Sequence, residues 1–349
     1  ILGRGLPLLL LVLISFFVGH GFPSGSPSDS PDPPPDTNVV RAVHLGRGTG
    51  LTNPLLDYVS ASTSDYSLLA LRDRIEDLAE RYAQQGALLS LSVYFRDLDS
   101  GQWFGIDEDK NYVPASLLKV PLMLLYLRLA GSVAVLREEE VVFQPRPDDA
   151  ANQTEISPLR DGEAYSLWEL LERMVVYSDN VASNLLAEHL YERWDPDSVR
   201  LATVESDLIA PVLSYPDGTL VVAAKNYSGL FRVLYYATYL DRDRSEEALG
   251  LLARTSFDRG IAAGVPPGTV VANKYGYGGH PGDPSDHQFH DCGIVYGEGG
   301  PYILCVLTKT TGVLPPHEII AAVSREVYDH LHSSDPAPLP EPPGKVRPH

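Results

Sequence analysis

A serine and a lysine in this chain have the types and the spacing needed for covalent catalysis. Ser116 and Lys119 lie three residues apart in the segment Ser-Leu-Leu-Lys. Residues three apart share one face of a helix, so the lysine amine can reach the serine hydroxyl. A lysine whose pKa is lowered by burial or by nearby cations can act as the base that activates a serine. The pair therefore predicts a nucleophilic serine at the start of a helix.

Two further motifs follow at wide spacing. Ser178-Asp179-Asn180 begins 62 residues after Ser116, and Lys274-Tyr275-Gly276 begins another 96 residues on. Ser-x-x-Lys, Ser-Asp-Asn and Lys-Thr-Gly together are the signature of class A β-lactamases and penicillin-binding proteins. Over roughly residues 53–332 the sequence resembles this class A β-lactamase-like, penicillin-binding serine hydrolase family.

The resemblance implies a role for each matched side chain. Ser116 would be the acylated nucleophile and Lys119 its proton acceptor. Ser178 would pass a proton to the leaving nitrogen, and Lys274 would lower the pKa of the central cluster and attract the substrate carboxylate. The expected catalytic residues are therefore Ser116, Lys119, Ser178 and Lys274.

The resemblance also implies how the substrate is held. Asn180 would hydrogen-bond a substrate amide, and Tyr275 and Gly276 would line the binding edge. The backbone N–H groups of Ser116 and Tyr277 would form the oxyanion hole. No metal or organic cofactor is needed for such chemistry.

The sequence departs from the family pattern in two places. Tyr275 stands where the third motif has a threonine, whose short hydroxyl would bind a carboxylate. Class A enzymes also carry a Glu-x-x-Leu-Asn loop after Ser-Asp-Asn, and its glutamate activates the deacylating water. None of the carboxylates between residues 180 and 220 lies in that pattern: Glu188, Glu192, Asp195, Asp197, Glu205, Asp207 and Asp217.

These features lead to a function and an alternative to it. We expect a serine hydrolase or acyltransferase that forms an acyl-enzyme with a β-lactam or a D-alanyl peptide. Without a positioned base the acyl-enzyme turns over slowly, which favours a penicillin-binding, peptidase-like member. The alternative is a non-hydrolytic β-lactam sensor or a cell-wall-binding pseudoenzyme.

Hydrophobic periodicity predicts the elements that position these motifs. Strands are expected near both ends of the domain, and the middle is helical. Strands at both ends must pair, so the expected fold class is α+β: a β-lactamase-like antiparallel sheet flanked by helices with an inserted all-α subdomain. The expected helices are 66–85, 114–130, 166–177, 181–194, 220–240, 245–254 and 316–332, and the strands are 87–95, 102–106, 269–274, 288–296 and 301–308.

Composition and the chain ends indicate the compartment. The formal net charge is −19, which argues against nucleic acid as a partner. Residues 1–22 contain a short apolar run that is expected to be a signal or membrane anchor, cleaved or retained, and residues 23–52 form a Pro/Ser-rich tether. The catalytic domain is expected at 53–333, before a disordered Pro-rich tail at 334–349. We therefore expect an extracytoplasmic protein of a bacterial envelope, which touches the membrane only through its N-terminal segment.

Two other features leave alternatives open. If Gly297 pairs with Gly300, Cys292 and Cys305 lie directly opposite each other. A cross-strand disulfide is then possible, although strain in such bridges favours two buried free thiols. A second cluster, between residues 280 and 291, holds three histidines and three aspartates. We expect a solvated loop there rather than a metal site, with His290 either lining the cleft or serving a structural role.

Overall fold

One antiparallel sheet joins the two ends of the domain. The computed structural model describes residues 50–52, 66–147, 149, 158–194, 220–279 and 286–333. The sheet has the strand order β2-β1-β7-β6-β5, so the last strand of the chain lies between the first strand and β6. Its strands are β1 (Leu88–Asp97), β2 (Trp103–Ile106), β5 (Val270–Gly278), β6 (His287–Gly297) and β7 (Gly300–Thr310).

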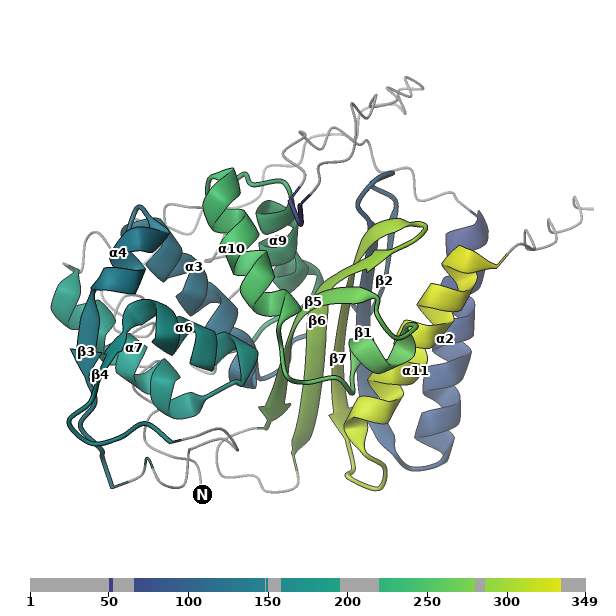
Figure 1. Cartoon of the computed structure of the whole chain (residues 1–349). Helices are drawn as coiled ribbons and strands as arrows, with labels where there is room; N and C mark the ends of the chain where they lie inside the picture. The colour runs from purple at the N-terminus through teal and green to yellow at the C-terminus, as the bar shows by residue number, and fades with distance from the viewer. Residues whose placement is uncertain are drawn as a thin grey trace, which may run out of the picture.

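Helices cover both faces of this sheet (Figure 1). The helices α2 (Tyr66–Gln84) and α11 (Pro316–His332) pack on one face. A helical lobe packs on the other, and it contains α3 (Lys119–Leu129), α4 (Val133–Glu138), α6 (Leu167–Val176), α7 (Asn180–Arg193), α9 (Ala224–Tyr235), α10 (Arg242–Ala253) and the hairpin of β3 (Glu140–Val142) and β4 (Ala164–Ser166). The predicted fold class is confirmed.

The period-two alternation of strand residues divides the core in two. On β5 and β6, Ala272, Cys292 and Ile294 belong to the core shared with the helical lobe. Their neighbours Val271 and Val295 belong to the core under α2 and α11. These strands are buried on both faces, and they also carry buried polar side chains, among them Lys274, His290 and Asp291. The edge strand β5 is thereby fixed between the two cores.

Some predicted boundaries differ from the structure. The third motif does not end its strand, because β5 continues to Gly278. The helix predicted from residue 220 begins only at Ala224, since Val222 pairs with Tyr112 in an isolated β-bridge. The short strands β3 and β4 were not predicted. Three residues each are too few to give a periodic signal.

The two cysteines are joined. Gly297 pairs with Gly300 and Cys292 with Cys305, so the predicted register is confirmed. The sulfur atoms form a disulfide between β6 and β7, and the expectation of free thiols was wrong. The rule against cross-strand bridges is statistical, and here both side chains point into the same core on adjacent strands.

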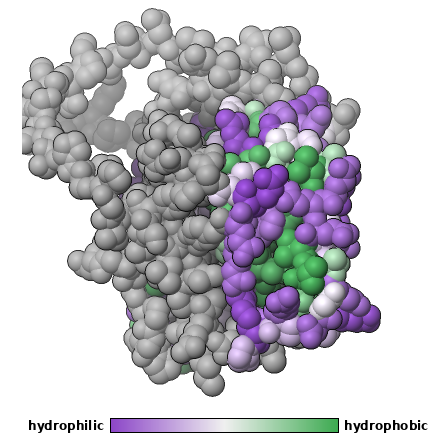
Figure 2. Space-filling model, turned by 90° about the vertical axis from the view of Figure 1, so that its left-hand side faces the viewer, coloured by the Kyte–Doolittle hydropathy of each residue, from purple (hydrophilic) through white to green (hydrophobic). Residues whose placement is uncertain are grey.

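The surface of the helical lobe is mixed. Figure 2 views it from the lobe side, where hydrophilic residues surround a smaller hydrophobic area. Among the described residues of this lobe, the exposed large apolar side chains include Val135 and Val142. Within the described ranges, no helix is both long and apolar enough to span a bilayer. The predicted anchor, the tail and the tether up to residue 49 lie outside the described residues. The last tether residues are described, and Leu51 N and Thr52 N donate to the Glu246 carboxylate on the domain.

Candidate active site

The segment that carries Ser116 is a tight turn rather than an ordinary helix start. Residues Ala115–Leu118 form a 3₁₀ turn that leads directly into α3. Ala115 has a φ of 48°, in the left-handed region that non-glycine residues rarely occupy. Such strained backbone persists only where the surrounding structure enforces it, and it is frequent at active sites. Ser116 itself is half-buried, so its hydroxyl remains accessible.

Strand β5 packs directly against this turn. A Cβ added at Gly276 would lie 3.1 Å from Pro114 O and 3.2 Å from Ser116 N. A side chain at this position would therefore push the strand away from the serine. The glycine of the third motif allows the backbones of β5 and the turn to approach closely.

The Lys119 amine lies at the centre of a polar cluster. Its Nζ atom is 3.2 Å from Ser116 Oγ and 3.1 Å from Ser178 Oγ. It also donates to Ser178 O and to Asn180 Oδ1, both at 2.6 Å. These contacts bring the side chains of the first two motifs together.

Burial changes the protonation of this lysine. Removal from water lowers the pKa of Lys119 to about 7, and the nearby Asp179 carboxylate offsets only part of that effect. Near neutral pH a large fraction of the amine is therefore unprotonated. A neutral amine has two N–H donors and one lone pair, so it can donate to two oxygens and still accept a proton.

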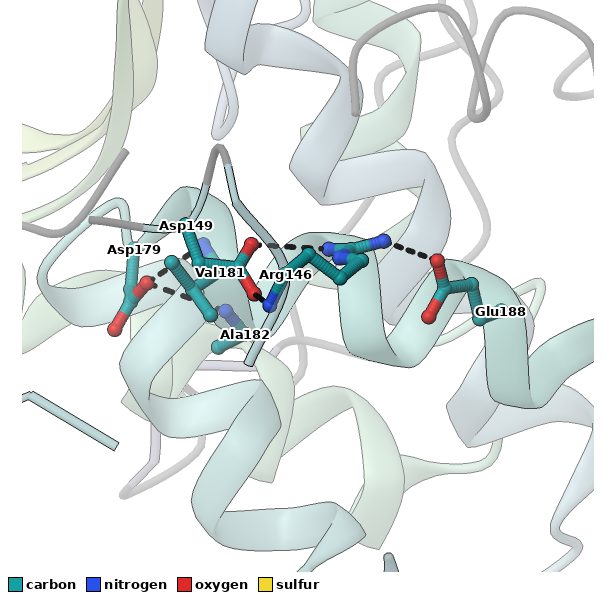
Figure 3. Close-up of polar contacts among 6 residues, drawn as sticks. All are labelled: Arg146, Asp149, Asp179, Val181, Ala182 and Glu188. Atoms are coloured by element: carbon teal, nitrogen blue, oxygen red, sulfur yellow. Dashed lines mark hydrogen bonds and ion pairs between the residues drawn. The ribbon is translucent and has the colours of Figure 1, made fainter. Parts of the chain in front are cut away.

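The second motif sits at the junction before α7. Ser178 has a φ of 57° and is buried, which turns its hydroxyl toward both lysines. Asp179 caps α7 by accepting hydrogen bonds from Val181 N and Ala182 N, as Figure 3 shows. Its other oxygen lies 3.5 Å from Arg173 Nε. The aspartate therefore fixes the turn that orients Ser178 and Asn180.

Lys274 reaches the same cluster from the sheet. It is fully buried and donates to Ser178 Oγ at 2.9 Å and to Tyr275 O at 2.8 Å. Burial, with a further contribution from the positive charge of Lys119, holds the pKa of Lys274 well below its usual range. The neighbouring Asp291 acts in the opposite direction. Ser178 Oγ therefore lies between two amines, one from each layer of the fold.

The buried carboxylate of Asp291 on β6 accepts hydrogen bonds from β5 and from the turn at Ile261. Asp291 accepts from Ile261 N at 2.9 Å and from Asn273 Nδ2 at 2.8 Å. Burial raises the pKa of Asp291 to about 6 despite these hydrogen bonds. The Asp291 side chain also fills the space where Gly260 would carry a Cβ.

The remaining predicted site residues line the edge of the cluster. Asn180 is exposed, and its Oδ1 atom contacts Lys119. The Tyr275 ring stacks on Phe257 with 4.2 Å between centroids, in the core under α11. Tyr277 is 58% exposed, so its backbone lies at an open part of the strand. Since β5 is an edge strand, alternate N–H groups have no partner strand on that side.

Of the carboxylates considered in place of the missing glutamate, the structure describes Glu188 and Glu192, both on α7. Glu188 lies on α7 and forms an ion pair with Arg146, which also binds Asp149 (Figure 3). Glu192 lies one turn further along the same helix. The other carboxylates considered between residues 180 and 220 lie outside the described residues.

In the histidine- and aspartate-rich segment at residues 280–291, the described histidines differ in burial. His280 and Asp283 lie outside the described residues, and His287 contacts the Tyr277 hydroxyl. His290 is fully buried on β6, and burial lowers its pKa to about 4. Its ring is hydrogen-bonded on both nitrogens, so it is a structural histidine rather than a side chain open to the cleft.

Comparison with a family model agrees with this geometry. Residues 70–331 match the model described as Beta-lactamase2, the beta-lactamase enzyme family. The chain belongs to this family. It is therefore a serine hydrolase of the class A β-lactamase-like type. A search of curated proteins found no significant match.

Solved structures show the same fold as this β-lactamase family member. PBP-A is 24% identical, with a TM-score of 0.62, and the match covers 75% of this chain and 96% of that one. A PBP-A mutant, solved as an acyl-enzyme complex with penicillin G, has a TM-score of 0.61, 24% identity and the same coverage. The class A β-lactamase from Mycobacterium abscessus is 22% identical, with a TM-score of 0.60, covering 74% and 97% of the two chains.

Several contributors to the site were not predicted from the sequence. Asp179 and Asp291 are the main examples, because their partners are backbone groups and a side chain distant in sequence. The aspartate before a helical run is a common N-cap, and that signal could have identified Asp179. Nothing local marks Asp291, whose partners lie 18 and 30 residues away.

Proposed function

We propose that this hydrolase is acylated on Ser116 by a β-lactam or by a D-alanyl peptide. The observation that carries the proposal is the contact between Lys119 Nζ and Ser116 Oγ. It joins a serine to a buried amine whose pKa is lowered to about 7, so that a base is available near neutral pH. Nucleophile and base within hydrogen-bond reach are the signature of activated-serine catalysis.

Acylation begins with a proton transfer inside the cluster. The two N–H groups of neutral Lys119 donate to Ser178 O and Asn180 Oδ1. Its lone pair takes the Ser116 proton as Oγ forms a bond to the substrate carbonyl carbon. The oxygen of that carbonyl becomes negative and is bound by the backbone N–H groups of Ser116 and Tyr277.

The leaving nitrogen then needs a proton. Ser178 gives its hydroxyl proton to that nitrogen as the C–N bond breaks, and it regains a proton from protonated Lys119 across 3.1 Å. Lys274 donates to Ser178 Oγ and stabilises the negative charge that develops there. The products are an ester on Ser116 and an amine, and the proton that left Ser116 is replaced on the leaving nitrogen through Lys119 and Ser178.

Substrate class rests on the groups around the serine. The exposed Asn180 amide can bind a peptide-like side chain, and the Lys274 amine supplies N–H donors for a carboxylate. The PBP-A acyl-enzyme with penicillin G supports a β-lactam as one such substrate. Tyr275 does not supply a threonine-like hydroxyl, because its ring stacks on Phe257. We therefore assign the carboxylate to Lys274.

The compartment is part of the same proposal. The apolar run in residues 1–22 and the Pro/Ser-rich stretch after it favour export and attachment to a bacterial membrane. Cell-wall peptides and β-lactams both occur outside that membrane. A disulfide between Cys292 and Cys305 also suits an oxidising compartment.

Intact-mass analysis after incubation with penicillin G tests the proposal. The protein should gain the mass of one penicillin G, and Ser116→Ala should gain none while keeping its melting temperature. Ser132→Ala, which removes a hydroxyl at the start of α4, is the matched control and should label normally. Labelling of the Ser116→Ala protein at another residue would show that the nucleophile is wrongly assigned.

Acylation should depend on pH through Lys119. Because the neutral amine is the active form, the acylation rate should rise with pH and level off above a midpoint near the lowered pKa of about 7. Below that midpoint the rate should fall about tenfold for each pH unit. The measurement is the second-order rate constant for penicillin G across the neutral range. A rate that falls as pH rises through neutrality would exclude Lys119 as the base.

A further inference from the structure

Two buried side chains of β6 bind the backbone of one residue, Val113, that lies close to the nucleophile. Val113 N donates to Gln288 Oε1 at 2.9 Å, and Val113 O lies 2.9 Å from His290 Nε2. Gln288 is 3% exposed and His290 is fully buried. The N–H and the C=O of Val113 are therefore both bound by side chains from a single strand.

The protonation of the His290 ring is set by its second partner. Thr308 N donates to Nδ1 at 3.3 Å, so Nδ1 is an acceptor. A neutral imidazole then carries its proton on Nε2, which donates to Val113 O. The Tyr112 ring packs edge-on to this imidazole, with 5.6 Å between centroids. The contacts with Thr308 N and Val113 O therefore fit the tautomer that carries its proton on Nε2.

The Gln288 amide is also fixed from behind. Its Nε2 group donates to Asp286 Oδ2 at 2.8 Å, which leaves Oε1 to accept from Val113. Asp286 is paired with Lys309 at 2.7 Å. Asp286, just before β6, and Lys309 on the neighbouring strand β7 therefore form an ion pair that orients the amide bound to the Val113 N–H.

Val113 lies directly before the strained turn that carries Ser116. Val113 lies three positions before Ser116, and the strained Ala115 lies between them. A left-handed alanine is unfavourable by itself and needs neighbours that enforce it. The 3₁₀ turn supplies one constraint through the hydrogen bond from Leu117 N to Pro114 O. The bonds to Val113 fix the chain on the other side of Ala115.

We propose that His290 and Gln288 are positioning residues, which clamp Val113 so that Ser116 Oγ stays within reach of Lys119. This inference rests on the proposed acylation of Ser116. Neither side chain touches the reacting atoms. Both act through the backbone of the turn that carries the serine.

Two conservative variants of His290 separate positioning from general packing. Asparagine can replace Nδ1 as the acceptor for Thr308 N, but it is too short to reach Val113 O. Glutamine reaches the place of Nε2 and can donate to Val113 O. His290→Asn should slow acylation by penicillin G by about 10–100-fold, because misplacement of a reacting group by about 1 Å has that effect. His290→Gln should remain within about threefold of the wild-type rate, because it keeps the bond that positions the turn.

Gln288→Met provides a second test on the other side of the clamp. It removes the acceptor for Val113 N, so acylation should slow by about tenfold or more. Hydrogen exchange of the Val113 amide should accelerate at the same time. A folded His290→Asn or Gln288→Met protein that is acylated at the wild-type rate would overturn the proposal. Equal losses in the Asn and Gln variants of His290 would do the same.

Failure of the proposed acylation of Ser116 can be distinguished from failure of the proposed clamp on Val113. If the wild-type protein takes up no penicillin G, the proposed function fails. The clamp is then judged by Val113 exchange alone: faster exchange in His290→Asn than in His290→Gln supports it, and equal exchange overturns it.

Discussion

Replacing Lys119 by methionine is expected to slow the acylation of Ser116 by about 10²–10⁴-fold, the usual contribution of a general base. Among the described residues, the Lys119 amine contacts Ser116 Oγ at 3.2 Å. Ser178 Oγ lies close to the same amine and to Lys274, but a hydroxyl is too weak a base to replace Lys119. Second-order rate constants for penicillin G, followed by intact mass, measure the loss.

The same substitution should not lower the melting temperature. Burial lowers the pKa of Lys119 from 10.5 to about 7, so the folded state binds fewer protons than the unfolded state between these values. The contribution of this group to stability therefore rises with pH across that window and is least favourable at or below neutral pH. Methionine carries no ionisable group, so it avoids the free-energy cost of burying the Lys119 amine. Lys110→Met, at an exposed lysine, is the control for both measurements.

A large loss of stability in Lys119→Met, with no loss in Lys110→Met, would contradict this account. It would show that the amine holds the cluster together rather than serving as a base. Acylation that survives in Lys119→Met at the wild-type rate would assign the base to another group.

Once formed, the acyl-enzyme with penicillin G is expected to persist about 10²–10⁴-fold longer than one whose deacylating water is activated by a positioned carboxylate. The sequence after Asn180 has no Glu-x-x-Leu-Asn pattern. Among the described carboxylates, Asp179 caps α7 and Glu188 is paired with Arg146. Neither is free to orient a water, so penicillin should inhibit more than it is consumed.

Decay of the acyl-enzyme mass peak tests this expectation. Glu205→Ala, Asp207→Ala and Asp217→Ala should leave the decay rate unchanged, as should Glu192→Ala on α7. If one of the three loop substitutions slows decay by about a hundredfold, that carboxylate is the base. The protein would then act as a true β-lactamase rather than a peptidase-like enzyme.

Local patterns were enough to predict the sheet and the three motifs. Alternation and turn glycines gave the β6–β7 hairpin with its Gly297–Gly300 pairing. Helical spacing gave α11 with its actual bounds, Pro316 to His332. The meeting of Ser116 with Lys119 followed from a three-residue spacing, and that of Ser178 with Lys274 from the resemblance to a family.

The contacts that were missed join residues far apart in sequence. His290 binds Val113 across 177 residues, and no local pattern distinguishes such a histidine from one that lines a cleft. The disulfide was judged from average strain, whereas the actual strand geometry brings the two cysteines together. The stacking of Tyr275 on Phe257 was not predicted, and Lys274 Nζ lies 4.2 Å from the centroid of the same ring.

The strand order β2-β1-β7-β6-β5 also determines when this protein can fold. Strand β1 ends near residue 97, but its central partner β7 runs to Thr310. During synthesis β1 can pair only with β2 until nearly the whole domain has been made. A sheet built on such distant contacts forms slowly, because a long loop must close before any pairing is gained. The central sheet is therefore completed only after the chain has been made as far as Thr310.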